Sequence, residues 1–176
     1  MSEENISPAQ EAMLETFQQH LAGELTGDIE AAMNTMTDNP YVHFVPVTTG
    51  GVGREEVRRF YSDHVVGKLF PPDAELITVS YTVGGDQLVE ELVVAFTHTE
   101  PVDWMLPGVR PTGKRVEVAA VAIVKFDAGK IAHEHIYWDQ ASVLVQLGLL
   151  DPTGLPVSGA ASARKVLDPN LPPREI

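Results

Sequence analysis

Residues 115–138 read RVEVAAVAIVKFDAGKIAHEHIYW, and this stretch decides the fold. Its β-branched, aromatic and polar side chains alternate on either side of a short break, which is typical of two paired β-strands. The break is the segment DAG at 127–129, and Gly129 can take the left-handed conformation that a three-residue hairpin loop requires. In that register Phe126 pairs with Lys130, and two long antiparallel strands run on from there.

The predicted hairpin has two faces of different polarity, because successive side chains on a strand point to opposite sides. The more apolar face, expected to be a concave wall, holds Val116, Val118, Ala120, Ala122, Val124, Phe126, Ala132, Glu134, Ile136 and Trp138. The opposite face holds Glu117, Ala119, Val121, Ile123, Lys125, Ile131, His133, His135 and Tyr137. Glu134 is therefore expected to be a lone carboxylate in an apolar surface.

Other parts of the chain show the same kinds of pattern. Segments AELITVSYTV and QLVEELVVAFTHT alternate around the turn GGD, which predicts a second antiparallel hairpin over 74–98. Apolar spacing and end signals predict helices over 8–27, 28–40, 53–68 and 139–150, and a strand over 41–46. This order indicates one α+β domain over residues 1–150. The Pro-rich residues 151–176 are expected to form an extended tail packed on the surface.

Composition excludes several classes of partner and chemistry. The chain has 176 residues, with 25 acidic and 12 basic side chains and a formal net charge of −13, so nucleic acid and anionic membranes are not expected as partners. Cysteine is absent, which excludes disulfides, thiol nucleophiles and thiolate metal sites. No apolar run approaches the ~20 residues that span a bilayer, and MSEENISPAQ has no features of a leader peptide. A cytoplasmic location is the resulting expectation.

Three segments resemble the SnoaL-like branch of the nuclear transport factor 2-like superfamily. They are PTGKRVEV at 111–118, FDAGKI at 126–131 and YWD at 137–139. The resemblance implies a cone-shaped, curved antiparallel sheet wrapped around N-terminal helices, with an apolar pocket for a small organic ligand. This branch includes polyketide cyclases and is related to ketosteroid isomerases and limonene epoxide hydrolases. The run from His133 to Gly159 is also similar to domains found alongside dienelactone hydrolase (carboxymethylenebutenolidase-like) proteins.

The chain departs from that family pattern at functional positions. In many members of the branch an aspartate stands three residues before the D of YWD, and here that place is Ile136. The positions that hold a water-positioning Tyr and Asn in the epoxide hydrolases are Val42 and Phe44. The usual acid–base residue is therefore missing, and epoxide hydrolysis of that type is not expected.

Glu134 is the first catalytic candidate, because an unpaired carboxylate in an apolar wall should have a raised pKa and suit proton transfer near neutral pH. The alternative is a structural Glu134 that pairs with an arginine or bonds a neighbouring strand. His98 is the second candidate, since a histidine titrates near neutral pH and could exchange a proton with Glu134. A structural histidine with its hydrogen bonds satisfied is the alternative for His98.

The ligand pocket is predicted from the apolar face and from the connection between the two hairpins. This connection, EPVDWMLPGVRPTG, carries an exposed-looking cluster of Trp104, Met105 and Leu106 and is interpreted as a lid. The predicted ligand-binding residues are Val42, Phe44, Trp104, Met105, Val118, Ala120, Ile136 and Trp138.

Histidines on the opposite face allow two interpretations. His133 and His135 point the same way, and with His43 they could bind a metal ion. We favour a homodimer surface, because Ala119, Val121, Ile123 and Tyr137 make the same face partly apolar. No metal site is assigned.

The sequence thus supports hypotheses from three classes. The first is an enzyme of isomerase, cyclase or hydrolase type that acts on an apolar carbonyl compound, with Glu134 as base, His98 as helper and no cofactor. The second is a non-catalytic module that binds a small apolar ligand. The third is an accessory interaction domain for a hydrolase.

Overall fold

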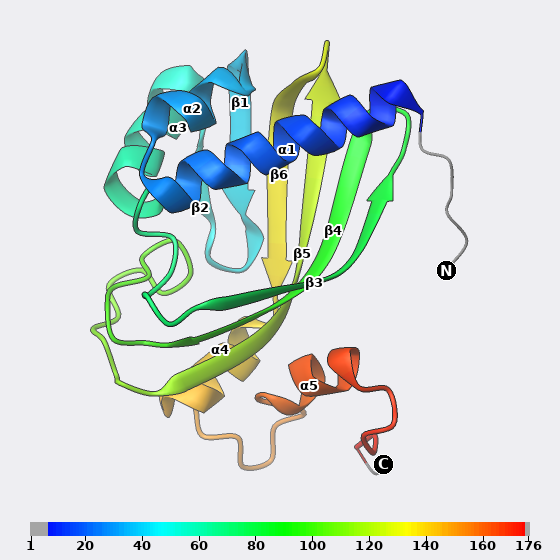
Figure 1. Ribbon diagram of the computed structural model, residues 1–176. Helices are drawn as coiled ribbons and strands as arrows, with labels where there is room; N and C mark the ends of the chain where they lie inside the picture. The colour runs from blue at the N-terminus through cyan, green and yellow to red at the C-terminus, as the bar shows by residue number, and fades with distance from the viewer. Residues whose placement is uncertain (1–6, 175–176) are drawn as a thin grey trace.

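Six strands form a single curved sheet in the computed structural model, which describes residues 7–174 (Figure 1). The strands are β1 (Met36–Phe44), β2 (Thr49–Val52), β3 (Glu75–Val83), β4 (Gln87–Thr97), β5 (Arg115–Asp127) and β6 (Lys130–Trp138). Their order is β2-β1-β6-β5-β4-β3, and all neighbours are antiparallel except β1 and β6, which run parallel. The predicted α+β class and the contiguous hairpins are confirmed. Within the described residues β2 and β3 remain as edges, so the sheet does not close into a barrel.

Helices cover parts of both faces of this sheet. They are α1 (Pro8–Thr26), α2 (Ile29–Asn34), α3 (Arg54–Phe60) with its π-helical continuation η2 (Tyr61–Val65), α4 (Gln140–Leu147) and α5 (Ala161–Leu167), and Val45–Val47 forms the 3₁₀ turn η1. A reciprocal capping box between Ser7 and Gln10 starts α1, and Gly27 in the left-handed conformation ends it. Between these two ends α1 crosses the concave side of the sheet (Figure 1). No helix within residues 7–174 is both long and apolar enough to cross a membrane.

Strand β1 begins earlier than the sequence indicated. A helix was expected over 28–40, but Met36 already pairs with Ile131 of β6. Burial explains the difference, because Met36 is completely buried in the core and helical spacing alone does not reveal that contact. Pro40 therefore lies inside a strand, where it has no N–H to donate, and the register with β6 shifts between Met36 and Tyr41.

The turn between β5 and β6 is tighter than predicted. Ala128 and Gly129 alone connect the strands, with φ angles of 48° and 78°, and Asp127 pairs with Lys130. Two consecutive left-handed residues are favoured in two-residue hairpin loops, because their twist matches that of the strands. The predicted pairing of Phe126 with Lys130 is therefore wrong.

A β-bulge follows this turn and decides which side chains face the concave side. Phe126 pairs with Ile131, whereas Lys125 pairs with His133, so Ala132 is the extra residue. Ile131, which was expected on the outer face, is consequently buried in the core. Because the extra residue reverses the alternation, the second half of β6 still presents the predicted side chains to the concave side. They are Glu134, Ile136 and Trp138.

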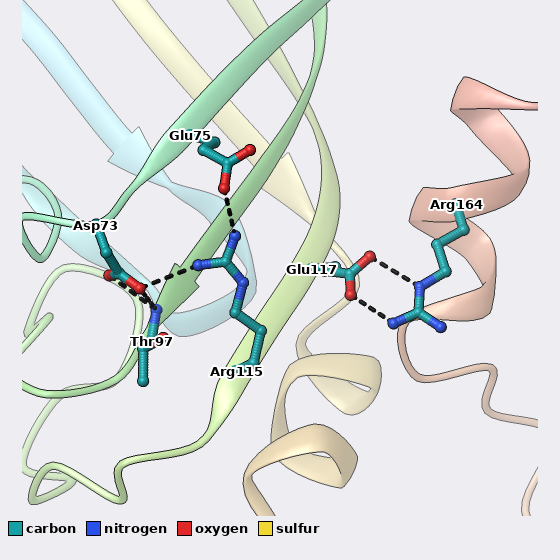
Figure 2. Close-up of polar contacts among 6 residues, drawn as sticks. All are labelled: Asp73, Glu75, Thr97, Arg115, Glu117 and Arg164. Atoms are coloured by element: carbon teal, nitrogen blue, oxygen red, sulfur yellow. Dashed lines mark hydrogen bonds and ion pairs between the residues drawn. The ribbon is translucent and has the colours of Figure 1, made fainter.

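The C-terminal tail is not wholly extended, contrary to what its prolines suggested. Ala161–Leu167 form α5, since the segment ASARKVL contains neither proline nor glycine. Ala163 is buried, and Arg164 Nε donates to Glu117 Oε2 of β5 at 2.8 Å (Figure 2). This ion pair joins α5 to the outer face of β5, part of which the helix covers.

A second charged group lies at the start of β5. Arg115 Nη1 is 3.1 Å from Asp73 Oδ2 and its Nη2 is 2.9 Å from Glu75 Oε1 (Figure 2). Asp73 also accepts from the backbone N–H of Thr97 at 3.1 Å. These side chains are exposed, so the ion pairs add little to the stability of the fold.

We predict that a substitution at Ala128 can make the turn, and with it the protein, more stable. An alanine at positive φ is strained, whereas asparagine tolerates this region and Asn-Gly is the preferred pair in such turns. Ala128→Asn should raise the free energy of unfolding in urea titrations by about 0.5–1 kcal/mol. Ala128→Val is the control and should lower it, because a β-branched residue disfavours positive φ. Equal stability of the two variants would contradict the turn geometry.

Candidate functional site

A cavity of about 90 Å³ lies between α1 and the concave face of the sheet. It is lined by Phe17, His20, Leu21, Glu24, Phe44, Leu69, Phe70, Leu76, Glu90, Leu92, Val94, Trp104, Ala120, Ala122, Glu134 and Ile136. Ala120 and Ala122 leave room there, because the flanking inward residues of β5 are the larger Val118 and Val124. A cavity of about 150 Å³ holds benzene, so this one admits a small molecule or one end of a larger ligand.

A larger surface depression of about 580 Å³ lies beside α1 and α2. Its lining includes Thr16, Gln19, Asp28 and Lys130, and it is more open to solvent than the cavity under α1. The buried titratable groups that could carry chemistry line the cavity, so we place the candidate site there.

Helix α1 contributes two polar residues that the sequence analysis missed. His20 and Glu24 are four residues apart and share the inward face of α1 with Phe17 and Leu21. Only the apolar members of this face were recognised, although His20 and Glu24 follow the same helical spacing. That spacing was the available signal, since a polar residue on an apolar helix face is expected to be buried with a partner.

The hydrogen bonds of the His20 ring assign its Nδ1 proton. His20 Nδ1 is 2.7 Å from Thr35 Oγ1 and 3.1 Å from the Ala32 carbonyl oxygen. The Thr35 hydroxyl donates its own hydrogen to Ala32 O at 2.6 Å, so its oxygen is left as an acceptor. Both partners of His20 Nδ1 are therefore acceptors, and this nitrogen carries a proton.

The other ring nitrogen faces a cluster of oxygen atoms. His20 Nε2 is 3.1 Å from Tyr61 Oη, 3.3 Å from Glu24 Oε1 and 3.4 Å from Glu134 Oε2. The Tyr61 hydroxyl donates to Glu134 Oε2 at 2.8 Å. With that hydrogen used, the Tyr61 oxygen can only accept from His20, which favours a doubly protonated imidazolium. His20 and Glu134 are 1% and 6% exposed, so this ion pair lies inside the protein.

Mutual interactions shift the pKa values of the cluster. Burial alone lowers the pKa of His20, but the charges of Glu134 and Glu24 and their hydrogen bonds raise it well above its ordinary value. Burial alone raises the pKa of Glu134, but the charge of His20 and the hydrogen bonds from His20 and Tyr61 lower it. The predicted raised pKa of Glu134 is therefore wrong, because His20 supplies a cation. Burial and the negative charges raise the pKa of Tyr61 well above its ordinary value, which keeps it a hydrogen-bond donor.

The same cluster has the donor atoms that a metal ion would need. One ligand atom each from His20, Glu24 and Glu134 lies within 4.8 Å of the others. An imidazole and two carboxylates could hold a divalent cation. In the structure these atoms contact one another, as described above.

The predicted ligand-binding residues divide into two groups. Phe44, Trp104, Ala120 and Ile136 line the cavity together with Glu134. The remaining predicted residues are buried in the surrounding core without lining the cavity. They are Val42, Met105, Val118 and Trp138.

The loop between the hairpins is packed inward, contrary to the expected exposure of its apolar cluster. Trp104 is buried, its indole N–H donates to Leu69 O at 2.7 Å, and its ring centroid lies 4.9 Å from that of Phe44. Thr49 Oγ1 donates to the Trp104 carbonyl at 2.8 Å. The loop thus supplies one wall of the cavity.

His98 is not brought to Glu134. It follows the end of β4, does not line the cavity, and its Nδ1 is 3.3 Å from Thr112 Oγ1. Burial lowers the pKa of His98. The histidine that meets Glu134 is His20.

Three histidines gather on the outer face of the sheet. The rings of His133 and His135 stack with centroids 4.5 Å apart, and the His43 ring is 6.1 Å from that of His135. Burial and nearby positive charge lower the pKa of His133 and His135. Among the described residues these three histidines do not form a group whose ligand atoms lie close enough to hold a metal ion, so we keep the interpretation of this face as a surface.

Comparison with known proteins places these features in a family. A family model described as SnoaL-like polyketide cyclase matches residues 11–147. Among solved structures, a candidate SnoaL-like polyketide cyclase from Jannaschia is 20% identical, with a TM-score of 0.68 over 84% of this chain and 99% of that one. AclR from Streptomyces galilaeus, described as a candidate hydroxylase, is 20% identical, with a TM-score of 0.59 over 81% of this chain and 88% of that one. An NTF2-like protein from Burkholderia xenovorans is 20% identical, with a TM-score of 0.53 over 76% and 87%.

These structural likenesses concern the fold alone. A search of curated protein sequences gave no significant match.

We predict that the buried pair makes stability depend on pH in two directions. The lowered pKa of Glu134 means that its contribution is present above about 4.3, its unfolded value, and is lost as pH falls through the folded value. The raised pKa of His20 means that its contribution is present below about 6.5 and is lost as pH rises through the folded value. The difference in unfolding free energy between wild type and Glu134→Gln should therefore peak between these limits. Chemical denaturation across pH 3–10 measures it, and a flat difference would contradict the pairing.

Proposed function

This chain belongs to the SnoaL-like polyketide cyclase family, and from that premise we propose that it is a cofactor-independent enzyme that moves a proton on a small, mostly apolar carbonyl compound. The observation that carries this proposal is the 3.4 Å contact between His20 Nε2 and the Glu134 carboxylate on the wall of an otherwise largely apolar cavity. Isomerisation, cyclisation and hydrolysis can all use such a pair.

In this proposal Glu134 keeps the role of base, and His20 takes the role expected of His98. Groups whose environments shift their pKa values apart are suited to act together as acid and base. Glu134 accepts a proton from the carbon next to the ligand carbonyl, while the His20 imidazolium donates to the carbonyl oxygen, which gives an enol. In a β,γ-unsaturated ketone this enol is a dienol, so return of the proton from Glu134 to its γ-carbon, and of the hydroxyl proton to His20, completes an isomerisation. Tyr61 contacts Glu134 without lining the cavity, so it is a positioning residue.

A non-catalytic binding module is the second candidate, and one observation favours it. A lowered pKa makes Glu134 a weak base, and a base works best when its pKa is close to the working pH. Ile136 occupies the place where many family members have an aspartate, and it lines the cavity. Under this alternative the ion pair orients an apolar ligand by hydrogen bonds.

We predict catalysed hydrogen exchange on small ketones such as cyclopentanone. In D₂O the enzyme should replace the protons next to the carbonyl with deuterium faster than buffer does, as proton NMR would show. Glu134→Gln keeps the size of the side chain and removes the base, so the rate should fall by about 10²-fold or more while ketone binding persists.

His98→Asn is the control and should exchange at the wild-type rate. Exchange by Glu134→Gln at the wild-type rate would exclude Glu134 as the base. Binding of ketones without any exchange in the wild type would favour the binding module.

We also propose that the protein is a homodimer formed through the outer face of the sheet. Ala119, Val121 and Ile123 are only partly buried there, and Tyr137 is 41% exposed. Apolar area of this kind on a sheet face favours association.

We predict that Val121→Asp abolishes this dimer. A carboxylate at the centre of the face would be desolvated on association, so sedimentation velocity should show a monomer at micromolar concentrations. Leu25→Asp is the control, because Leu25 is 48% exposed on α1. A monomeric wild type would refute the proposal.

A further inference from the structure

Glu90 is a buried carboxylate that the acid–base pair does not use. It lies on the inner side of β4, lines the cavity and is 3% exposed. Its Oε1 accepts from the Thr78 hydroxyl at 2.8 Å. Among the residues from 7 to 174, no lysine, arginine or histidine nitrogen lies within 4.0 Å of it. Buried carboxylates are normally paired with a cation, and the described residues provide none for Glu90.

The whole cavity shares this excess of acidic groups. Its lining contains three carboxylates, from Glu24, Glu90 and Glu134, and one imidazole, from His20. Neither lysine nor arginine is among the lining residues. Movement of the proton between His20 and Glu134 leaves the total charge unchanged. The cavity therefore attracts positive charge in either state of the pair and repels carboxylate or phosphate groups.

The rest of the wall suits an organic cation better than a metal ion. Phe17, Phe44, Phe70 and Trp104 line the cavity, and the ring centroids of Phe44 and Phe70 lie 4.9 and 5.4 Å from that of Trp104. Aromatic faces attract ammonium groups within about 6 Å and bind them more strongly when water is excluded. A hydrated divalent cation gains little from four aromatic side chains.

We propose that the natural ligand carries a protonated amine or quaternary ammonium group, which the cavity holds between Glu90 and the aromatic rings. This inference rests on the proposed function, since it names the class of ligand for the same cavity. The cavity volume of about 90 Å³ accommodates a group of a few non-hydrogen atoms. The ligand class is thus a small amino ketone or a related cationic compound.

The test compares tert-butylammonium with tert-butanol, which have the same shape and differ in charge. Calorimetric titration of the full chain at about 0.15 M salt screens the acidic surface, and EDTA removes metal ions. The cation should bind at least tenfold more tightly than the alcohol. Equal affinities, tighter binding of the alcohol, or no binding of either compound would overturn the proposal.

A pair of matched variants on β4 tests whether Glu90 causes the preference for the cation over the alcohol. Glu90→Gln should bring the two affinities close together while the affinity for tert-butanol stays constant. Glu91→Gln removes the same charge from the outer side of the strand, where Glu91 contacts Ser80, and should keep the wild-type ratio. An unchanged ratio in Glu90→Gln would overturn the assignment, as would equal effects of both variants.

A second variant covers the case in which Glu90→Gln does not fold. Ala122→Leu fills the space beside Glu90 and should abolish binding of both compounds, whereas wild-type binding by this variant would place the site elsewhere and overturn the proposal. Failure of the cation test with intact ketone exchange would leave the proposed function standing. Selective cation binding without ketone exchange would support the ligand class and count against catalysis.

Discussion

The pairing of His20 with Glu134 is the interaction on which the rest of the structure depends. Burial by itself would raise the pKa of Glu134 and lower the pKa of His20. Their mutual contact reverses both shifts, so the two side chains stay ionised together. The pair also joins the first helix to the last strand, and Thr35 and Tyr61 bring the segments after α2 and α3 to the same point. The contact that joins the helices to the sheet is thus also the one proposed to transfer protons.

The sequence predicted what depends on local alternation. Both hairpins and the inward face of β5 follow from side chains that alternate along a strand. Glu134 faces inward as predicted, but only because the bulge at Ala132 offsets the change in turn register. What could not be predicted depends on contacts between distant segments. Met36 enters a strand because the core buries it, and Glu134 is ionised because His20 reaches it from α1. His98 illustrates the limit, since residue type suggested a partner for Glu134 and only the fold shows which histidine is near.

The sheet separates two groups of histidines. Carboxylates and one histidine share the concave side with aromatic rings, whereas His43, His133 and His135 gather on the convex side. Burial lowers the pKa of His133 and His135, so these two side chains favour the neutral form. On the outer face His135 pairs across the strands with Ile123, and Val121 pairs with Tyr137, so the surface around these histidines is partly apolar.

The bulge at Ala132 has a consequence for how such a site can evolve. Without an extra residue there, regular alternation from Ile131 onward would turn Glu134 outward and bring His133 and His135 inward. Loss of the Ala132 codon itself would leave a regular hairpin with the present faces. A one-codon insertion that the strand could not absorb would replace the Glu134 carboxylate on the concave side with imidazoles in a single mutational step. Length variation in this hairpin is thus a genetic route to new chemistry that needs no substitution in the cavity.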